Sequence, residues 1–203
     1  MTKFSKMFLL GYLVKLADAV ANKAPIKLSL PHIIALAEVG HKGSIDELTK
    51  VLDTIYNRYT AVTNSQYQPY ARALYGYDAK KWPKTLEEVI RYPRHFSNAS
   101  NANEIYRILT QAGGDISKLP PKYKQFSQWL ASIAPQLTAY KYQAPSTMEG
   151  VPLFFISRTR KGGDIFGAEP TRYQLLETPE TFRHKFYTIN PEFLVAKSRS
   201  NKR

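Results

Sequence analysis

The most regular stretch of the chain is SIDELTKVLDTIYNRY, residues 44–59, and it predicts an amphipathic helix. Apolar side chains recur at positions 45, 48, 51, 52, 55, 56 and 59, which is the period of a helix with one buried face. Ser44 is followed three residues later by Glu47, a capping-box pattern in which each side chain satisfies a free backbone amide. We therefore expect a helix over residues 45–59 that starts at this box.

Three more helices are predicted further along the chain, each from a capping residue at its start or a helix-breaking residue at its end. The signals are Thr85 with Glu88 before Pro93, Asn101 with Glu104 before Gly113-Gly114, and an apolar stripe from Tyr123 to Ile133 before Pro135.

The pattern changes after residue 150. Residues 151–157 and 182–188 are rich in β-branched and aromatic side chains, and residues 160–164 between them have the composition of a turn. These segments predict a small antiparallel sheet. The fold class expected is therefore α+β, mainly helical, with the sheet in the C-terminal third.

The two ends of the chain are expected to lie outside a main domain of residues 30–190. Residues 1–29 begin like a secretory signal, but Lys15 and Asp18 interrupt the pattern where cleavage would occur, so a packed amphipathic helix and a linker are expected. Residues 191–203 form a basic tail, which most simply is a solvated chain end. No stretch approaches the ~20 apolar residues that a membrane-spanning helix needs.

Composition excludes several kinds of chemistry. The chain has 203 residues, 43% of them hydrophobic, enough for one substantial core. It contains no cysteine, and its histidines at 32, 41, 95 and 184 show no metal-ligand spacing, so no cofactor or metal is expected. The formal net charge of +13 predicts attraction to polyanions, among which nucleic acid, anionic lipid and cell wall polymers all remain open.

Glu38 is the first candidate for chemistry. It follows an apolar run, residues 33–37, in a short helix expected to open at Ser29 or at Leu30-Pro31. Burial raises the pKa of a carboxyl, and a protonated glutamic acid can donate its proton to a glycosidic oxygen. Taken by itself, a glutamate at a helix end is an ordinary surface residue.

Glu38 opens a series of short motifs. In chain order they are Ala37-Glu38-Val39-Gly40, Tyr56-Asn57-Arg58, Trp82-Pro83-Lys84-Thr85 with Val89, Phe96-Ser97, and His184-Lys185-Phe186-Tyr187. The series resembles the SleB/CwlJ-like cell wall hydrolases, known from spore cortex-lytic enzymes and phage lysins. The resemblance covers about residues 30–190, although residues 98–150 carry no motif, and it departs from the family at His41, His95 and Gly150.

The resemblance implies a lysozyme-like catalytic domain that cleaves the glycan strands of peptidoglycan. The bond cleaved would be the β-1,4 bond between N-acetylmuramic acid and N-acetylglucosamine, and the enzyme would act as a lytic transglycosylase. Glu38 would be the one catalytic acid. Hydrolysis would need a second carboxylate, for which Asp46 and Glu47 are the nearest candidates, although helix capping is the simpler role for both. The expected partners are glycan strands, the anionic wall surface and other virion proteins. The protein is expected in a virion or in the host cytoplasm before release, and to act on the cell wall or in the periplasm.

Five further residues are candidates for substrate binding: Asn57, Arg58, Ser97, His184 and Tyr187. Each also has a structural reading, as a helix end, a turn or a strand position. On a strand, His184 and Tyr187 point to opposite faces, so one of them at most lines a groove directly. We expect Glu38 to lie at the floor of an elongated groove, with Ser97 and one of this pair within about 10 Å of it.

A basic structural or nucleic-acid-binding protein, such as a virion or ribosome component, is the alternative function. Its support is the net charge of +13 and the basic tail. No helix shows a one-sided Lys/Arg stripe and no known nucleic-acid motif is present, so no specific nucleic acid is expected. A wall-binding relative without catalysis is a third possibility.

Overall fold

The computed structural model describes residues 26–41, 43–93, 95–159 and 163–194. The amphipathic helix expected near the N-terminus and the basic residues at 197–203 lie outside this part of the chain. Within it the fold is α+β, as predicted: mainly helical, with a three-stranded antiparallel sheet in the C-terminal third. No described helix has the length and apolar character to cross a membrane.

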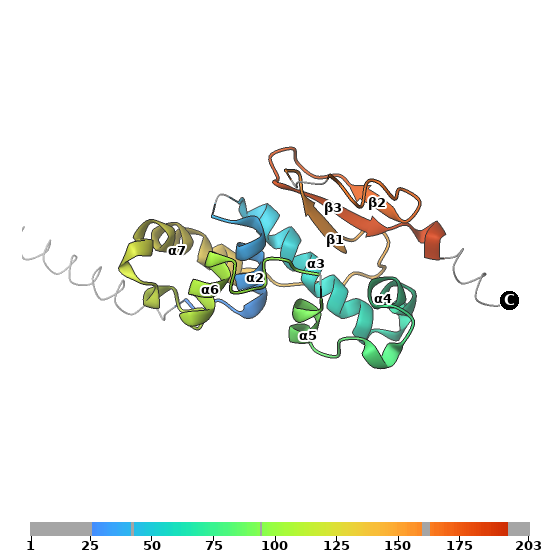
Figure 1. Ribbon diagram of the computed structural model, residues 1–203, viewed down its shortest axis with the longest axis horizontal. Helices are drawn as coiled ribbons and strands as arrows, with labels where there is room; N and C mark the ends of the chain where they lie inside the picture. The colour runs from blue at the N-terminus through green and yellow to red at the C-terminus, as the bar shows by residue number, and fades with distance from the viewer. Residues whose placement is uncertain (1–25, 42, 94, 160–162, 195–203) are drawn as a thin grey trace, which may run out of the picture.

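The helix α3 runs through the middle of the molecule, with α6 and α7 at one end, α4 and α5 at the other, and the sheet alongside it (Figure 1). The helices are α2 (Leu30–Val39), α3 (Ile45–Thr63), α4 (Gln68–Tyr75), α5 (Leu86–Arg91), α6 (Glu104–Gln111) and α7 (Lys124–Ala139). Short 3-10 turns are η1 (Ser65–Tyr67), η2 (Ala79–Lys81), η3 (Ile116–Lys118) and η4 (Pro121–Tyr123). The strands are β1 (Phe154–Ser157), β2 (Tyr173–Leu176) and β3 (His184–Ile189).

The predicted helix after Ser44 is confirmed as α3, which continues one turn further than expected, to Thr63. The Ser44 hydroxyl accepts the backbone N–H of Glu47 at 3.1 Å, as the capping box requires. The other predicted bond of the capping box, from the backbone N–H of Ser44 to the carboxylate of Glu47, is wrong. The carboxylate of Glu47 turns away from the helix start to bind His184, because it is buried and the strand offers it two donors.

The start of α6 is corrected by two residues. Asn103, not Asn101, caps this helix, since its side-chain oxygen accepts the N–H of Tyr106 at 3.0 Å. The predicted end is confirmed: Gly113 and Gly114 both have positive φ, 63° and 77°. A Cβ at Gly114 would lie 2.1 Å from the backbone oxygen of Leu28, so this position also needs glycine for close packing.

The capping box of α5 is confirmed, with Thr85 and Glu88 each bound to the other's backbone N–H. In contrast, α7 does not stop before Pro135 but continues through it to Ala139. Proline costs the helix one hydrogen bond. The fully buried side chains Ala134 and Leu137 on either side of it offset that loss, because ending the helix there would expose them.

The sheet has the strand order β1-β3-β2, with β3 paired antiparallel to both neighbours. Both predicted strands are present, but β2, over residues 173–176, was not predicted. It has two exposed and two half-buried side chains, so its sequence lacks the apolar pattern that marks β1 and β3.

Two groups of buried side chains make up the core. The first joins α2, α3, α6 and α7 and includes Phe186 of β3, whereas the second joins α3, α4 and β1 and includes Tyr187. Residues just outside the expected range of 30–190 also contact the core: Leu28 is 3% exposed in the first group, and Phe193 packs against the second.

Asn57 and Arg58 attach the sheet to α3. The Asn57 amide donates to the carbonyl of Pro152 at 3.1 Å, and Arg58 Nε donates to the carbonyl of Leu153 at 2.6 Å. The guanidinium of Arg58 also lies over the rings of Phe96 and Phe154, 4.8 and 5.2 Å from their centroids. This side chain is 3% exposed, so it is a structural tie between the helical body and the segment that enters β1.

Replacing Arg58 by alanine should lower the free energy of unfolding by about 3 kcal/mol, because a cavity forms and a buried carbonyl loses its donor. The control is Arg91→Ala, which removes an exposed pair with Glu87 and should change stability by less than about 0.5 kcal/mol. Urea denaturation measures both. Equal losses for the two variants would contradict this role of Arg58.

Candidate active site

Glu38 lies in the last turn of α2. Ser29 is the N-cap and Pro31 stands in the first turn, as the sequence predicted, and Gly40 closes the helix with a φ of 82°. The side chains just before Glu38 are buried in the core, so α2 is held rigidly against α3 and α6. Glu38 itself is half-buried at the edge of this packed region.

Asn98 holds the carboxyl group of Glu38 with two hydrogen bonds. Its backbone N–H donates to Oε1 at 3.0 Å, and its side-chain amide donates to Oε2 at 2.8 Å. Both bonds come from one residue in the turn between α5 and α6. The carboxyl is therefore fixed in one orientation before any ligand arrives.

The pKa of Glu38 is raised above its ordinary value, chiefly because burial disfavours the charged form. The two hydrogen bonds from Asn98 act in the opposite direction, as do the nearby side chains of His184 and Arg58. Burial prevails over these effects. Glu38 thus keeps its proton to a higher pH than an exposed glutamic acid does.

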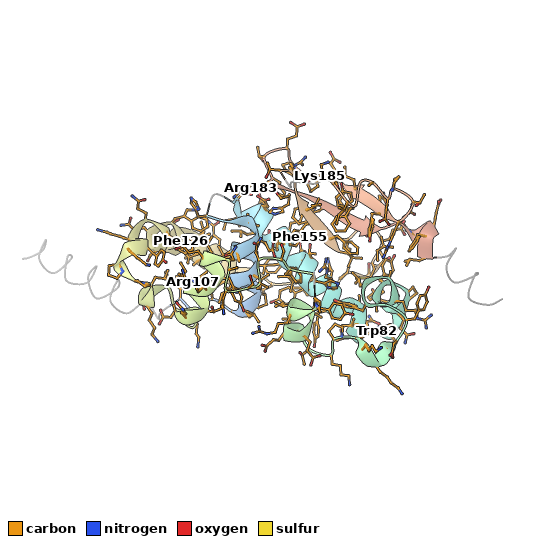
Figure 2. All side chains as sticks on the ribbon, viewed as in Figure 1. Trp82, Arg107, Phe126, Phe155, Arg183 and Lys185 are labelled. Carbon is orange, nitrogen blue, oxygen red and sulfur yellow. The ribbon has the colours of Figure 1, made fainter. Side chains whose placement is uncertain are left out.

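The start of β3 is bound to the corner between α2 and α3. Glu47 Oε1 accepts the backbone N–H of His184 at 3.0 Å and lies 2.8 Å from its ring Nδ1. The guanidinium of Arg183 donates to the carbonyl of Val39 at 2.8 Å (Figure 2). These bonds bring residues about 140 positions apart in sequence to the end of α2 that carries Glu38.

The structure therefore brings some of the predicted site residues together. His184 lies close enough to Glu38 to influence its pKa, and Ser97 is an exposed turn residue joined directly to Asn98. His184 is itself only 5% exposed and is bound to Glu47. The expected grouping of Ser97 and His184 around Glu38 in an elongated groove stays a prediction.

The other predicted substrate-binding residues lie elsewhere. Tyr187 is 2% exposed on the opposite face of β3, where its hydroxyl donates to Asp164. Asn57 and Arg58 are 3% exposed and are bound to backbone carbonyls. None of these three side chains is open to direct contact with a sugar, so their roles here are structural.

Sequence reasoning missed Asn98, Glu47 as a partner of His184, and Arg183. Asn98 follows the Phe96-Ser97 motif directly, which was the one local sign of its importance. The spacing of Glu47 from Ser44 predicts only a capping role, and Arg183 lies in no recognised motif. In each case the partner lies at least 60 residues away in sequence, so no local pattern identifies it.

Two of the surface cavities lined by described residues are of a size to hold a ligand. One, of about 580 Å³, is lined by residues of α6, η4 and α7 together with His41. The other, of about 490 Å³, is lined by residues around α5, including Trp82. Neither lining includes Glu38. No group of three or more His, Cys, Asp or Glu side chains suited to a metal is found among the described residues.

Comparison with known proteins gave no match. No protein-family model matches the chain, and neither a curated protein nor a solved structure does so. The likeness to the SleB/CwlJ-like hydrolases, and to lysozyme in fold, therefore rests on the short motifs alone.

Glu38→Gln should gain stability relative to the wild type as pH rises. Folded protein with a raised Glu38 pKa holds a proton that the unfolded chain has released, so increasing pH through this window, from about 4.5 upward, destabilises the wild type. A neutral glutamine removes this cost. The measurement is the difference in Tm between variant and wild type from pH 4 to pH 8, and a difference that is flat or falls with pH would contradict the raised pKa.

Proposed function

We propose that this protein cleaves the glycan strands of peptidoglycan, with Glu38 as the acid, in the manner of a lytic transglycosylase. The observation that carries the proposal is the carboxyl of Glu38 itself. It is half-buried, its pKa is raised, and Asn98 fixes its orientation. This is the state that a general acid for a glycosidic bond requires, in a chain whose motifs resemble enzymes of that type.

In the proposed reaction, protonated Glu38 donates its proton to the oxygen between N-acetylmuramic acid and N-acetylglucosamine. The C1–O bond breaks as the C6 hydroxyl of the muramic acid attacks C1. Ionised Glu38 then takes the hydroxyl proton and returns to its starting state. The products are a 1,6-anhydro sugar and a new free 4-hydroxyl on the departing chain.

The surroundings of Glu38 favour transglycosylation over hydrolysis. Hydrolysis would need a second carboxylate, besides the general acid, to activate water. Glu47 is 1% exposed and bound to His184, so its carboxylate is not free for that purpose. Asp46 is exposed in the first turn of α3, where its charge is favourable to the helix. A mechanism with one carboxylate fits this arrangement.

The partners implied are glycan strands and an anionic wall, reached from a virion or from the host cytoplasm. The net charge of +13 supports attraction to such a surface.

Glu38→Gln should reduce lysis of purified peptidoglycan by at least about a hundredfold, because the transferable proton is lost while the shape is kept. Zymography and mass analysis of the released muropeptides measure this, and the wild type should yield anhydro ends. Glu180→Gln, at an exposed position, is the control and should retain full activity. A Glu38→Gln variant with more than a few per cent of wild-type activity would exclude Glu38 as the acid.

Salt should slow the attack on whole walls but not the chemical step. Surface charges are screened beyond ~8 Å at physiological ionic strength, so adsorption of a protein of net charge +13 should weaken as salt increases. The glycosidic bond is uncharged, so cleavage of short soluble glycans should change little. Rates on both substrates from 50 to 500 mM salt test this. Tight binding to DNA or RNA at physiological salt, without turnover of peptidoglycan, would favour the nucleic-acid alternative instead.

A further inference from the structure

The cavity of about 580 Å³ beside α2 is shaped by the N-terminal part of α7. Tyr123, Phe126 and Trp129 follow one another at intervals of three residues and line it together. Each of these side chains is half-buried, with one part packed on the core and the rest forming the cavity wall. The rings of Phe126 and Trp129 lie 5.7 Å apart between centroids and are tilted by 31°.

We propose that this cavity is a saccharide-binding subsite that holds the glycan strand beyond the bond cleaved at Glu38. The inference rests on the proposed function and names a second part of the same binding surface. Aromatic side chains present an apolar face to the C–H groups of a sugar ring, and a partly exposed wall of three such side chains can hold more than one ring.

Polar groups around the aromatic wall suit the substituents of peptidoglycan sugars. The Tyr123 hydroxyl donates to the carboxylate of Glu104 at 2.9 Å, which leaves that carboxylate with capacity to accept from sugar hydroxyl or amide groups. Lys122 Nζ lies 4.9 Å from the centroid of the Tyr123 ring, and Lys124 lies beside it on the lining. These ammonium groups complement the carboxylates of muramic acid stem peptides.

One residue on the lining of the cavity is close in sequence to Glu38. His41, on its lining, is three residues beyond Glu38. On the facing wall, the amide of Asn103 donates to the carbonyl of Ala37 at 3.1 Å, and α6 begins directly after it. A strand bound at Glu38 and extended along this side of the molecule would therefore meet the aromatic wall.

A glycan is favoured over a single nucleic-acid strand, although aromatic rings and lysines can also bind bases and phosphates. The exposed carboxylate of Glu104, 4.0 Å from Arg107, stands on the lining beside Lys122 and Lys124. It is an acceptor that sugar hydroxyl and amide groups can use, whereas a phosphodiester has no donor to offer it.

The chain has two tryptophans, Trp82 and Trp129, which allows a direct test by fluorescence. Trp82 lies in the other cavity, at the opposite end of the molecule from Phe126 (Figure 2). In a Glu38→Gln/Trp82→Phe variant all indole emission comes from Trp129. A soluble tetrasaccharide of alternating N-acetylglucosamine and N-acetylmuramic acid should shift this emission and protect it from acrylamide quenching.

The matched control is Glu38→Gln/Trp129→Phe, whose remaining Trp82 should not respond to the tetrasaccharide. Sedimentation with insoluble peptidoglycan gives a second measurement that keeps Trp82 in place. There, Glu38→Gln/Trp129→Ala should bind roughly tenfold more weakly than Glu38→Gln, a typical loss for one stacking aromatic. An unresponsive Trp129 together with unchanged wall binding would overturn the subsite, as would equal protection of Trp129 by oligothymidine at physiological salt.

Failure of the subsite and failure of the proposed function give different results. If the wild type cleaves the tetrasaccharide while Trp129 is unresponsive, the enzyme proposal stands and the subsite falls. If Trp129 responds but the wild type leaves the tetrasaccharide uncleaved, the subsite stands as a wall-binding surface and catalysis by Glu38 falls.

Discussion

The two hydrogen bonds between Glu47 and His184 fix the arrangement on which the candidate site depends. Glu47 is 1% exposed, and an unpaired carboxylate at that depth would be costly to bury. Its Oε1 is satisfied by the backbone and ring of the first residue of β3. Shifting the strand by one residue would leave the acid unpaired and would exchange the faces of Phe186 and Tyr187. One buried contact thus sets both the position of the sheet and its register.

The same contact determines the electrostatic surroundings of Glu38. It holds His184 near the carboxyl, while the buried guanidinium of Arg58 acts from the other attachment of the sheet. Burial lowers the pKa of Arg58 to about 10, which still leaves it charged at neutral pH. Burial of Glu38 favours its protonated form, whereas His184, Arg58 and Asn98 favour the ionised form. An acid that must give up a proton and take it back benefits from such opposed effects.

The sequence predicted the features that depend on neighbouring residues and missed those that depend on distant ones. The fold class, the helix that carries Glu38, the cap at Thr85 and the glycine end of α6 were all read from spacings of a few residues. The second half of the box at Ser44 was wrong because a partner 137 residues away competes for Glu47. The strand β2 was not predicted because its position depends on pairing with β3 and its sequence has no apolar pattern.

Residues 98–150 show most clearly what a sequence pattern leaves undetermined. They carry no motif of the resembling family, yet they supply Asn98 and the wall of the larger cavity. The stripe that includes Phe126 and Trp129 correctly predicted a helix face directed at the core, but such a stripe does not say where the covering elements end. Leu130 is fully buried, whereas Trp129 is only partly covered. Where the stripe is longer than the elements that cover it, aromatic surface stays exposed, here on the lining of the larger cavity.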